Sequence, residues 1–559
     1  MQPSQSSPST RTSKIRGSSL RGIVILAAVL ALSALLGGHF GASANATPSN
    51  ADDLQDSVKT FTRVLAVVQH NYADPINVDK AIYDGAIPGM LHVLDPHSQF
   101  FDPQQYALFE EEQEGKYYGV GMVVEQRDNQ TVVQAPFVNS PAYKAGIRPG
   151  DVILKVDGKN CTGLTTTQVA DLLKGPKDTA VHISLGREGW QKPIDVTIIR
   201  AEIPRPAVEF ATMVRPGIGY VHVTTFNETT DSDLENALEK LGYPNLRGLI
   251  IDLRDNGGGL LNQSVGMADM FLDKGQLVVS HRGRSSPERR YYAVQGNQGS
   301  DIPLVILING GSASASEIFA GAMQDHDRAM IVGTTSFGKG LVGTEFPLSY
   351  NTALLLITAR YYTPSGRSIQ RNYKNETLYD YHYDPQPPQS PQVKLTDTGR
   401  TVYGGGGITP DVVVQEPKPD DFQQLLERRG VLYPTDLPPQ GVGDFARFYL
   451  SQKPDVTQDF EVNDAVIAQL KKFLAQQNIE VTDQQIQQNL PYLKWEIKRE
   501  VFTSVFGLDA GYKVALENDP QLDKAVSALP AARLLYANAR KVDAERAAAG
   551  NSTNSNQRP

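Results

Sequence analysis

Asn309-Gly310-Gly311-Ser312-Ala313-Ser314-Ala315-Ser316-Glu317 is the segment around which this 559-residue chain is organised. It follows the apolar run Leu304–Ile308, which is typical of a buried strand, and it leads into a helical pattern. Small residues around Ser314 would let another chain approach closely, and free N–H groups at the helix start favour negative charge. The segment therefore predicts a strand–turn–helix unit that presents Ser314 beside an anion-stabilising helix end.

Strands and helices alternate around this unit. Ile218–Val223 and Gly248–Leu253 are further apolar runs of the strand type. Helical patterns cover Asp231–Leu241, which its first residue can cap, and the residues from Leu261 onward. This alternation predicts an α/β layered core over residues 204–416.

Ser336-Phe337-Gly338-Lys339-Gly340 places one lysine among glycines and an aromatic residue. A serine nucleophile needs a base, and no histidine stands in a G-x-S-x-G context. A lysine serves as a base only when its pKa falls far below the solution value of about 10.4, which burial can achieve. Residue types alone leave two interpretations open: a Ser314/Lys339 catalytic pair, or a surface lysine in a glycine hairpin.

Composition excludes several classes of protein. The chain has 53 basic and 62 acidic residues and a formal charge of −9, without a basic stripe, which argues against nucleic-acid binding. The single cysteine, Cys161, excludes an internal disulfide and a multi-cysteine metal site. The histidines lack metal-ligand spacing, so we predict neither a metal nor a cofactor. The length implies several domains.

The two ends of the chain differ from its middle. Residues 22–38 form an apolar run behind basic residues, and Ala44-Asn45-Ala46 supplies an A-x-A cleavage signal. Residues 1–46 are therefore predicted to be a signal peptide or, if uncleaved, an anchor that associates the chain with the inner membrane. In either case we expect export to the periplasm or cell envelope. We further predict an N-terminal helical region at 47–115, a C-terminal helical extension at 417–546 and a disordered tail at 547–559.

Between the N-terminal helices and the α/β core, the order of elements resembles a PDZ domain over residues 116–203. Strand patterns are followed by a short helix at Ser140–Gly146, the turn Arg148-Pro149-Gly150-Asp151, and a second helix near Thr166–Leu173. In this interpretation the N–H groups of Tyr118-Gly119-Val120-Gly121 bind a peptide's terminal carboxylate while the peptide adds to the sheet edge. Alternatively, the glycines only provide the backbone angles of a strand turn.

Several motifs in order resemble those of the carboxy-terminal processing proteases, also called tail-specific proteases. They are Asp-Pro-His-Ser (95–98), Asp-Leu-Arg-Asp-Asn-Gly-Gly-Gly (252–259), residues 309–318, Phe-Gly-Lys-Gly (337–340) and Thr-Ala-Arg-Tyr-Tyr-Thr-Pro-Ser-Gly (358–366). The resemblance covers about residues 55–415. It implies a multidomain α/β + β fold with an N-terminal helical region, a PDZ domain, an α/β serine-protease core and a C-terminal helical extension.

The same resemblance implies roles for single residues. Ser314 would be the nucleophile and Lys339 the general base, while Ala315 with Gly257 or Gly258 would form the oxyanion hole. Ser312 and Ser316 would be bystanders or helix-capping hydroxyls. The expected activity is that of a serine endopeptidase that cleaves unfolded or tagged polypeptides near free C-termini, which the PDZ domain captures. The oligomeric state is not predicted.

One position departs from the family pattern. Many members carry a glutamine four residues after the lysine, where it orients the amine, and this chain has Gly343 there. The lysine would then be held by Thr344 or by a backbone carbonyl. The alternative function is a catalytically silent, PDZ-bearing adaptor that regulates another envelope protease.

Overall fold

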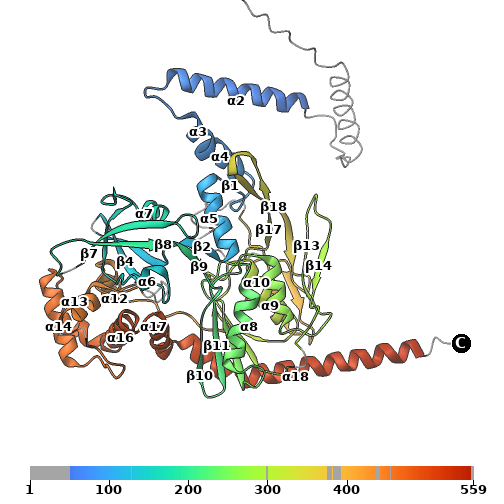
Figure 1. Cartoon of the computed structure of the whole chain (residues 1–559). Coiled ribbons are helices and arrows are strands. Elements are labelled where there is room, and N and C mark those ends of the chain that lie inside the picture. The colour runs from blue at the N-terminus through green and yellow to red at the C-terminus, as the bar shows by residue number, and fades with distance from the viewer. Residues whose placement is uncertain are drawn as a thin grey trace, which may run out of the picture. The chain divides into compact units, whose positions relative to one another are not determined.

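The computed structural model describes residues 51–555, except for 128, 188, 298–299, 374–380, 382–391, 435–440 and 454. The predicted signal peptide or anchor at 1–46 and the last four residues of the predicted tail lie outside the described residues. The chain divides into two compact units, Met1–Ile82 and Tyr83–Pro559, whose elements are labelled in Figure 1. Each unit is described by itself.

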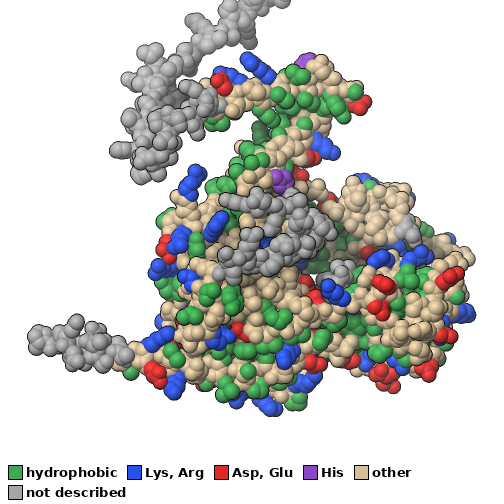
Figure 2. Space-filling model, turned by 180° about the vertical axis from the view of Figure 1, so that it is seen from behind, with side chains coloured by type: hydrophobic (Ala, Val, Ile, Leu, Met, Phe, Trp, Pro, Cys, Tyr) green, Lys and Arg blue, Asp and Glu red, His purple; other side chains and the backbone are tan. Residues whose placement is uncertain are grey.

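In the first unit, helix α2 (Ala51–Asn71) matches the predicted helical period. It is followed by α3 (Val78–Lys80), which the Asn77 side chain caps, and by the π-helical turn η1 (Ala81–Ala86), which crosses into the second unit. Apolar side chains of α2 are exposed (Figure 2), among them Leu54, Val58 and Phe61.

The second unit begins with α4 (Ile87–His92), β1 (Gln99–Phe101) and α5 (Pro103–Glu114). Asp95 fixes the turn before β1, because its carboxylate accepts the N–H groups of His97 and Ser98 and the Ser98 hydroxyl. The region predicted to be helical at 47–115 thus also contains a strand, and β1 pairs with a distant strand at residues 353–355.

The PDZ domain is built on one antiparallel sheet in the order β3-β4-β5-β7-β8, with β6 on β5. Its strands are β3 (Met122–Arg127), β4 (Gln130–Pro136), β5 (Val152–Val156), β6 (Lys159–Asn160), β7 (Ala180–Gly186) and β8 (Ile194–Ile199). Helices α6 (Pro141–Lys144) and α7 (Thr166–Leu173) directly follow Ser140 and Thr165, whose side chains cap them. Cys161 is buried in this core, and burial raises its thiol pKa.

Strands β2 (Lys116–Gly119) and β9 (Ala201–Pro204) form an antiparallel pair. In the sequence, β2 directly precedes the PDZ sheet and β9 directly follows it. Beyond β9 lies the predicted α/β core, whose central sheet has the order β10-β11-β12-β15-β16-β21. Its strands are β10 (Val208–Arg215), β11 (Ile218–Val223), β12 (Gly248–Asp252), β15 (Leu304–Ile308), β16 (Met330–Gly333) and β21 (Val412–Val413). The strands from β11 to β21 are parallel, and β10 is antiparallel to β11.

Helices cover both faces of this sheet. This is expected, because successive side chains of a strand point to opposite faces and those of β12 and β15 are all buried. Ile251 and Ile306 pack into one core with α8 (Thr230–Leu241), α9 (Leu261–Asp269) and α10 (Ala315–Asp325). Ile250 and Val305 face the other side, against α17 (Leu508–Ala515) and α18 (Pro520–Ser555). Helix α8 begins one residue before Asp231, whose predicted capping role is wrong because Thr229 occupies the N-cap position.

A second, antiparallel sheet has the order β1-β18-β13-β14, with β17 on β18. Its remaining strands are β13 (Leu277–Arg282), β14 (Arg289–Tyr292), β17 (Leu341–Pro347) and β18 (Ala353–Tyr362), with the 3-10 turn η2 (Ser349–Asn351) between the last two. The hairpin β19 (Gln392–Leu395) and β20 (Thr401–Gly404) stands apart from both sheets.

The C-terminal extension is divided between two cores. Helices α12 (Asp421–Arg428), α13 (Asp444–Gln452), α14 (Asp464–Gln476), α15 (Asp483–Gln488) and α16 (Leu490–Phe506) enclose their own apolar core. In contrast, α17, the turn η3 (Leu516–Asn518) and α18 pack on the protease sheet. The prediction of one separate helical body at 417–546 is therefore corrected, and α18 continues as a helix to Ser555, past the predicted start of the tail.

Candidate active site

Two serine hydroxyls fix the turn between β15 and α10. The Ser312 hydroxyl donates to the Leu253 carbonyl at 2.7 Å and accepts the Asn309 N–H at 2.9 Å. The Ser316 hydroxyl donates to the Asn256 carbonyl at 2.8 Å. Both serines are fully buried, so the turn is attached to the neighbouring strand end at two points. Neither residue caps α10 through these bonds.

Ser314 stands at the top of this turn with φ 54° and ψ −111°, a backbone conformation that non-glycine residues rarely adopt. A serine at a sharp strand-to-helix turn of this kind has its hydroxyl directed away from the supporting sheet. The Tyr361 hydroxyl donates to the Ser314 carbonyl at 3.1 Å from a buried position. The hydrogen bond from Tyr361 therefore helps to hold Ser314 in its strained backbone conformation.

The glycine loop after β12 lies directly against Ser314. A Cβ on Gly258 would lie 2.8 Å from Ser314 Cβ and 2.8 Å from the Ala315 nitrogen, so only glycine fits there. The Gly258 N–H donates to Asn256 Oδ1 at 2.9 Å. The N–H groups of Gly257 and Ala315, by contrast, have no hydrogen-bond acceptor within the described part of the chain. These two N–H groups are the donors that the site offers to an anion.

Glu317 joins the serine turn to the lysine segment. Its Oε2 accepts the backbone N–H of Ser314 and that of Lys339, both at 2.9 Å. Its Oε1 accepts the Ser336 hydroxyl at 2.5 Å and the Gly338 N–H at 2.6 Å. Burial raises the pKa of Glu317, although these four donated bonds favour the ionised form. One buried carboxylate thus holds both predicted catalytic residues by their main chains.

Lys339 lies in a non-strand segment just before β17 and is not on the surface of a glycine hairpin. Burial lowers the pKa of its amine, and the negative charges of Glu317 and Asp95 offset part of that effect. Asp95 comes from the Asp-Pro-His-Ser motif, 244 positions earlier in the sequence, so the fold brings this motif to the lysine.

Aromatic residues enclose the segment that precedes the lysine. The rings of Phe337, His97 and Tyr381 lie edge to face, with centroid separations of 5.5–6.4 Å. The guanidinium of Arg371 stacks on Phe337 at 3.9 Å and on Tyr381 at 4.4 Å. This packing fixes the position of Phe337 and hence of the backbone that leads to Lys339.

Gly343 lies in β17, next to a bulge at Val342 and Gly343. A Cβ there would meet Leu355 Cδ1 at 2.9 Å, so a larger residue would need that side chain to shift. The Thr344 hydroxyl pairs with the Thr358 hydroxyl at 2.6 Å on an exposed surface. This contact lends no support to the suggestion that Thr344 orients the lysine, which stays a prediction.

In the PDZ domain, the predicted carboxylate-binding residues form a strand end and the turn behind it. Tyr118 and Gly119 pair with Glu202 and Ala201 in the β2–β9 ribbon, so this half is not a free loop. Gly121 has φ 78°, and its carbonyl accepts the Ser140 hydroxyl at 2.8 Å. Within the described residues, the N–H groups of Val120 and Gly121 have no acceptor.

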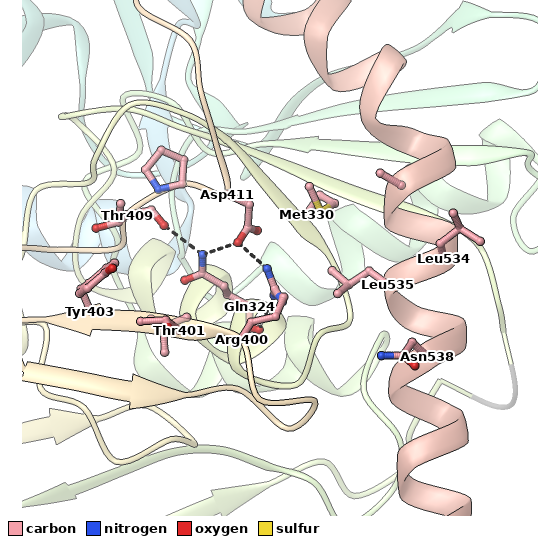
Figure 3. A pocket seen from close by; sticks show the side chains of 13 residues that line it. Gln324, Met330, Arg400, Thr401, Tyr403, Thr409, Asp411, Leu534, Leu535 and Asn538 are labelled. Carbon is pink, nitrogen blue, oxygen red and sulfur yellow. Dashed lines mark hydrogen bonds and ion pairs between the residues drawn. The ribbon is translucent and has the colours of Figure 1, made fainter.

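A separate pocket of about 620 Å³ lies between the core and α18 (Figure 3). Its charged lining is already paired, because Arg400 contacts Asp327 and Asp411 at 2.6 Å and Gln324 donates to Asp411 and to the Thr409 carbonyl. None of the predicted catalytic residues lines this pocket. The described residues also contain no cluster of side chains that could hold a metal ion.

Comparison with known proteins assigns two stretches of the chain to families. The family model described as Peptidase family S41 matches residues 217–379, and a PDZ domain model matches residues 132–187. The chain is 38% identical over 381 residues to a carboxy-terminal-processing protease of Bartonella bacilliformis, which spans 67% of this chain and 79% of that protein. It is 32% identical over 388 residues to the carboxy-terminal processing protease CtpA of Bacillus subtilis, with 68% of this chain and 82% of that protein covered.

A solved structure of a photosystem II D1 C-terminal processing protease aligns with 64% of this chain and 92% of that chain, at 29% identity and a TM-score of 0.34. The sequence matches define the class as a serine peptidase that also carries a PDZ domain. Within that class, the chain belongs to the carboxy-terminal processing proteases of peptidase family S41.

The site also contains residues that the sequence did not single out. Glu317, Asp95 and Tyr361 all lie within the motifs quoted above, yet the motifs alone assign them no role. Their function becomes visible only when residues far apart in the chain are brought together. The sequence does contain one signal for Glu317. A charged residue stands there in the first turn of a helix start that is otherwise small and apolar, and glutamate is rarely fully buried unless it has partners.

Proposed function

We propose that this chain is an exported endopeptidase in which Ser314 is the nucleophile and Lys339 is the general base. The observation that carries the proposal is the pair of 2.9 Å hydrogen bonds by which one Glu317 oxygen holds the backbone amides of both residues. The strained backbone of Ser314 and the burial that lowers the pKa of Lys339 support it independently. No third, orienting side chain is part of the proposal.

In this mechanism the neutral amine of Lys339 accepts the hydroxyl proton as Ser314 Oγ forms a bond to the scissile carbonyl carbon. The carbonyl oxygen becomes an anion, which the N–H groups of Ala315 and Gly257 stabilise at the start of α10. Collapse breaks the C–N bond, the lysine ammonium gives its proton to the leaving amine, and an ester remains on Ser314. Lys339 then accepts a proton from the water that attacks the ester carbonyl, and it gives this proton to Ser314 Oγ as the C–O bond breaks, which regenerates the serine hydroxyl and the neutral amine.

Gly257 is the better candidate for the second donor, because the Gly258 N–H is already used by Asn256. Gly258 then has a different role, since its lack of a side chain lets the loop approach Ser314. Sequence alone could not separate these two glycines.

The proposal is tested by incubating the purified full-length chain with an intrinsically unfolded protein that ends in apolar residues. We expect fragments from the wild-type chain and none from Ser314→Ala. Turnover by Ser314→Ala at the wild-type rate would refute the nucleophile. If neither protein cleaves but both bind the substrate, the adaptor function is correct. The absence of a glutamine at Gly343 favours that second function, and Gly343→Gln would then restore cleavage.

Substrate capture by the PDZ domain is part of the same proposal. The unbonded N–H groups of Val120 and Gly121 would bind the terminal carboxylate of the substrate, with Tyr118 and Gly119 fixing the strand before them. Amidation of the substrate C-terminus removes that charge. We expect it to raise KM about tenfold and to change kcat less than about twofold, measured with matched acid and amide peptides. Equal KM values for the two peptides would contradict capture of the chain end.

Export rests on the sequence of residues 22–38 and Ala44-Asn45-Ala46. Within the described residues, no helix has the length and apolar character that crossing a bilayer requires. We expect the native chain in the envelope fraction of its cells. A first residue of Thr47, read by mass spectrometry, would mark a cleaved signal, and a retained N-terminus in the membrane fraction would mark an anchor. Recovery with the cytoplasmic proteins would contradict export.

A further inference from the structure

Arg254 connects the glycine loop beside Ser314 to the far C-terminal part of the chain. It follows β12 by two residues, and its Nε donates to both carboxylate oxygens of Asp252 at 3.0 Å. Its Nη1 donates to Gln521 Oε1 at 2.9 Å and its Nη2 to Asp519 Oδ2 at 2.7 Å. Asp519 and Gln521 lie at the start of α18, and Gln521 is 1% exposed. The arginine is therefore held between the strand end and the start of α18, where its partner Asp519 lies 265 residues further along the chain.

A second connection reaches the same loops from the C-terminal side. Asn309 Nδ2 donates to Asp255 Oδ1 at 2.9 Å and to Glu416 Oε1 at 3.0 Å. Its Oδ1 accepts the N–H of Asp255 at 2.9 Å and of Gly311 at 3.0 Å. Asn309 thus joins the glycine loop to the serine turn. Glu416 holds this asparagine, and Gln521 in turn donates to the carbonyl of Val414, two residues before Glu416.

The contacts of Arg254 and Asn309 affect the position of the Gly257 N–H, because the glycine loop has little freedom to move beside Ser314. Asp255 has φ 58°, an uncommon conformation for a residue other than glycine, so its neighbours must hold it in place. Gly258 follows three residues later in close contact with Ser314. The strength of a hydrogen bond falls steeply with distance and angle, so a small shift of this loop would weaken the donor at Gly257.

We propose that Asp519 and Gln521 are positioning residues for catalysis, which act through Arg254 to hold the Gly257 N–H in place for the oxyanion. The proposal rests on the proposed function and assigns a catalytic contribution to the C-terminal extension, in which the sequence revealed no chemistry. It separates two roles of α18: covering the sheet, and fixing the loop that faces the substrate.

The decisive variant is Asp519→Asn. Asparagine caps a helix as well as aspartate does, so the bond from the Leu522 N–H to this side chain is kept. Its amide group would instead place a donor against the donor Nη2 of Arg254, and the charge-assisted bond is lost. We expect kcat to fall about tenfold with KM within about twofold of wild type, because substrate capture lies elsewhere. Gln521→Met, similar in size but without an acceptor for Nη1, should act in the same direction.

The inhibition constant of a peptide boronate distinguishes a positioning role from a merely structural one. The boronate forms a tetrahedral adduct on the serine with an oxygen at the oxyanion position, so its inhibition constant should rise about as much as kcat falls. Affinity for the product peptide should stay unchanged. The matched control is Asp523→Asn, which makes the same charge change one helical turn later, where Asp523 pairs with exposed Arg215 at 3.0 Å. We expect wild-type kinetics from this control.

Wild-type kcat in both Asp519→Asn and Gln521→Met would overturn the inference. So would an effect on KM alone, or an equal loss of kcat in Asp523→Asn. If Asp519→Asn does not fold, as judged by its thermal transition, Gln521→Met decides. Failure of the proposed function has a different signature: wild type does not cleave, or Ser314→Ala cleaves as fast as wild type. If wild type is active, Ser314→Ala is inactive and Asp519→Asn is fully active, only the positioning role is refuted.

Discussion

Glu317 shows how a single buried side chain can join two segments of a candidate active site. Its carboxylate has its capacity filled by four donors, three of them backbone N–H groups. It also lies near enough to Lys339 for its charge to raise the pKa of the amine. The net pKa of Lys339 is nevertheless lowered, since burial is the larger effect. The pKa of Lys339 is therefore set by desolvation, which lowers it, and by the charges of Glu317 and Asp95, which raise it.

Asp95→Asn tests this balance at the second carboxylate. The charge of Asp95 raises the pKa of Lys339, so its removal should lower that pKa and increase the neutral fraction of the amine. We expect the acidic limb of the pH profile of kcat/KM to shift to lower pH. Asparagine keeps an acceptor for the N–H groups of His97 and Ser98. An unmoved limb, or one at higher pH, would show that Lys339 is not the titrating base, and Asp523→Asn should leave the limb in place.

Gly258→Ala tests the close approach of the glycine loop. A methyl group there would lie 2.6 Å from the Ala313 carbonyl oxygen, and the residue has φ 96°, which disfavours alanine. We expect kcat/KM to fall by about 100-fold or more, as for the loss of an oxyanion donor. Gly310→Ala is the control, because nothing lies within 4 Å of the position that its added methyl group would take. Similar losses in both variants would contradict the specific role of Gly258.

Helix α10 is the element that determines where the site forms, since it carries Ser314 at its N-terminus and is buried along its whole length. Its C-terminal end is fixed by His326, whose Nδ1 lies 2.6 Å from Asp397 Oδ2 and whose Nε2 lies 2.7 Å from the Leu277 carbonyl. Both partners are acceptors, which favours the doubly protonated ring. Burial lowers the pKa of His326, but the bond and charge of Asp397 outweigh it, and the net pKa is raised.

A raised pKa in the folded state means that His326 stabilises the fold fully below about pH 6.5 and loses this effect as the pH rises through its folded-state pKa. His326→Gln should therefore destabilise the protein by about 1 kcal/mol more at pH 6 than at pH 9. The measurement is the denaturant midpoint of wild type and variant at both pH values. A difference that does not change with pH would contradict a charged His326.

At the scale of the whole molecule, local patterns predicted the elements well but not their long-range partners. The apolar run Leu304–Ile308 is a strand with the predicted bounds, and the PDZ and α/β regions lie where the sequence indicated. The four donors to Glu317 come from two segments about twenty residues apart, and no local pattern encodes that meeting. Likewise α18 looked like part of a separate body, because a helical pattern in the sequence does not reveal which surface the helix covers.

Gly343 illustrates the opposite limit. The sequence has a glycine where the family resemblance implies a glutamine, yet it could not show that Thr344 pairs with Thr358 across the hairpin. Cross-strand neighbours depend on the register of β17 on β18, and a bulge at Val342 and Gly343 changes that register. In the proposed dyad, Lys339 is therefore placed by its main-chain bond to Glu317 and by its burial, and no third residue is assigned.

The most direct test of the serine–lysine dyad is the kcat/KM of Lys339→Ala measured beside that of Ser314→Ala on one peptide substrate near neutral pH. If Lys339 is the base, both values should fall by at least about 1000-fold, and to similar levels, because the two residues act as a unit. Binding of the substrate C-terminus should be unchanged in both variants. A Lys339→Ala protein that keeps more than about a tenth of wild-type kcat/KM, beside an inactive Ser314→Ala, would contradict the dyad.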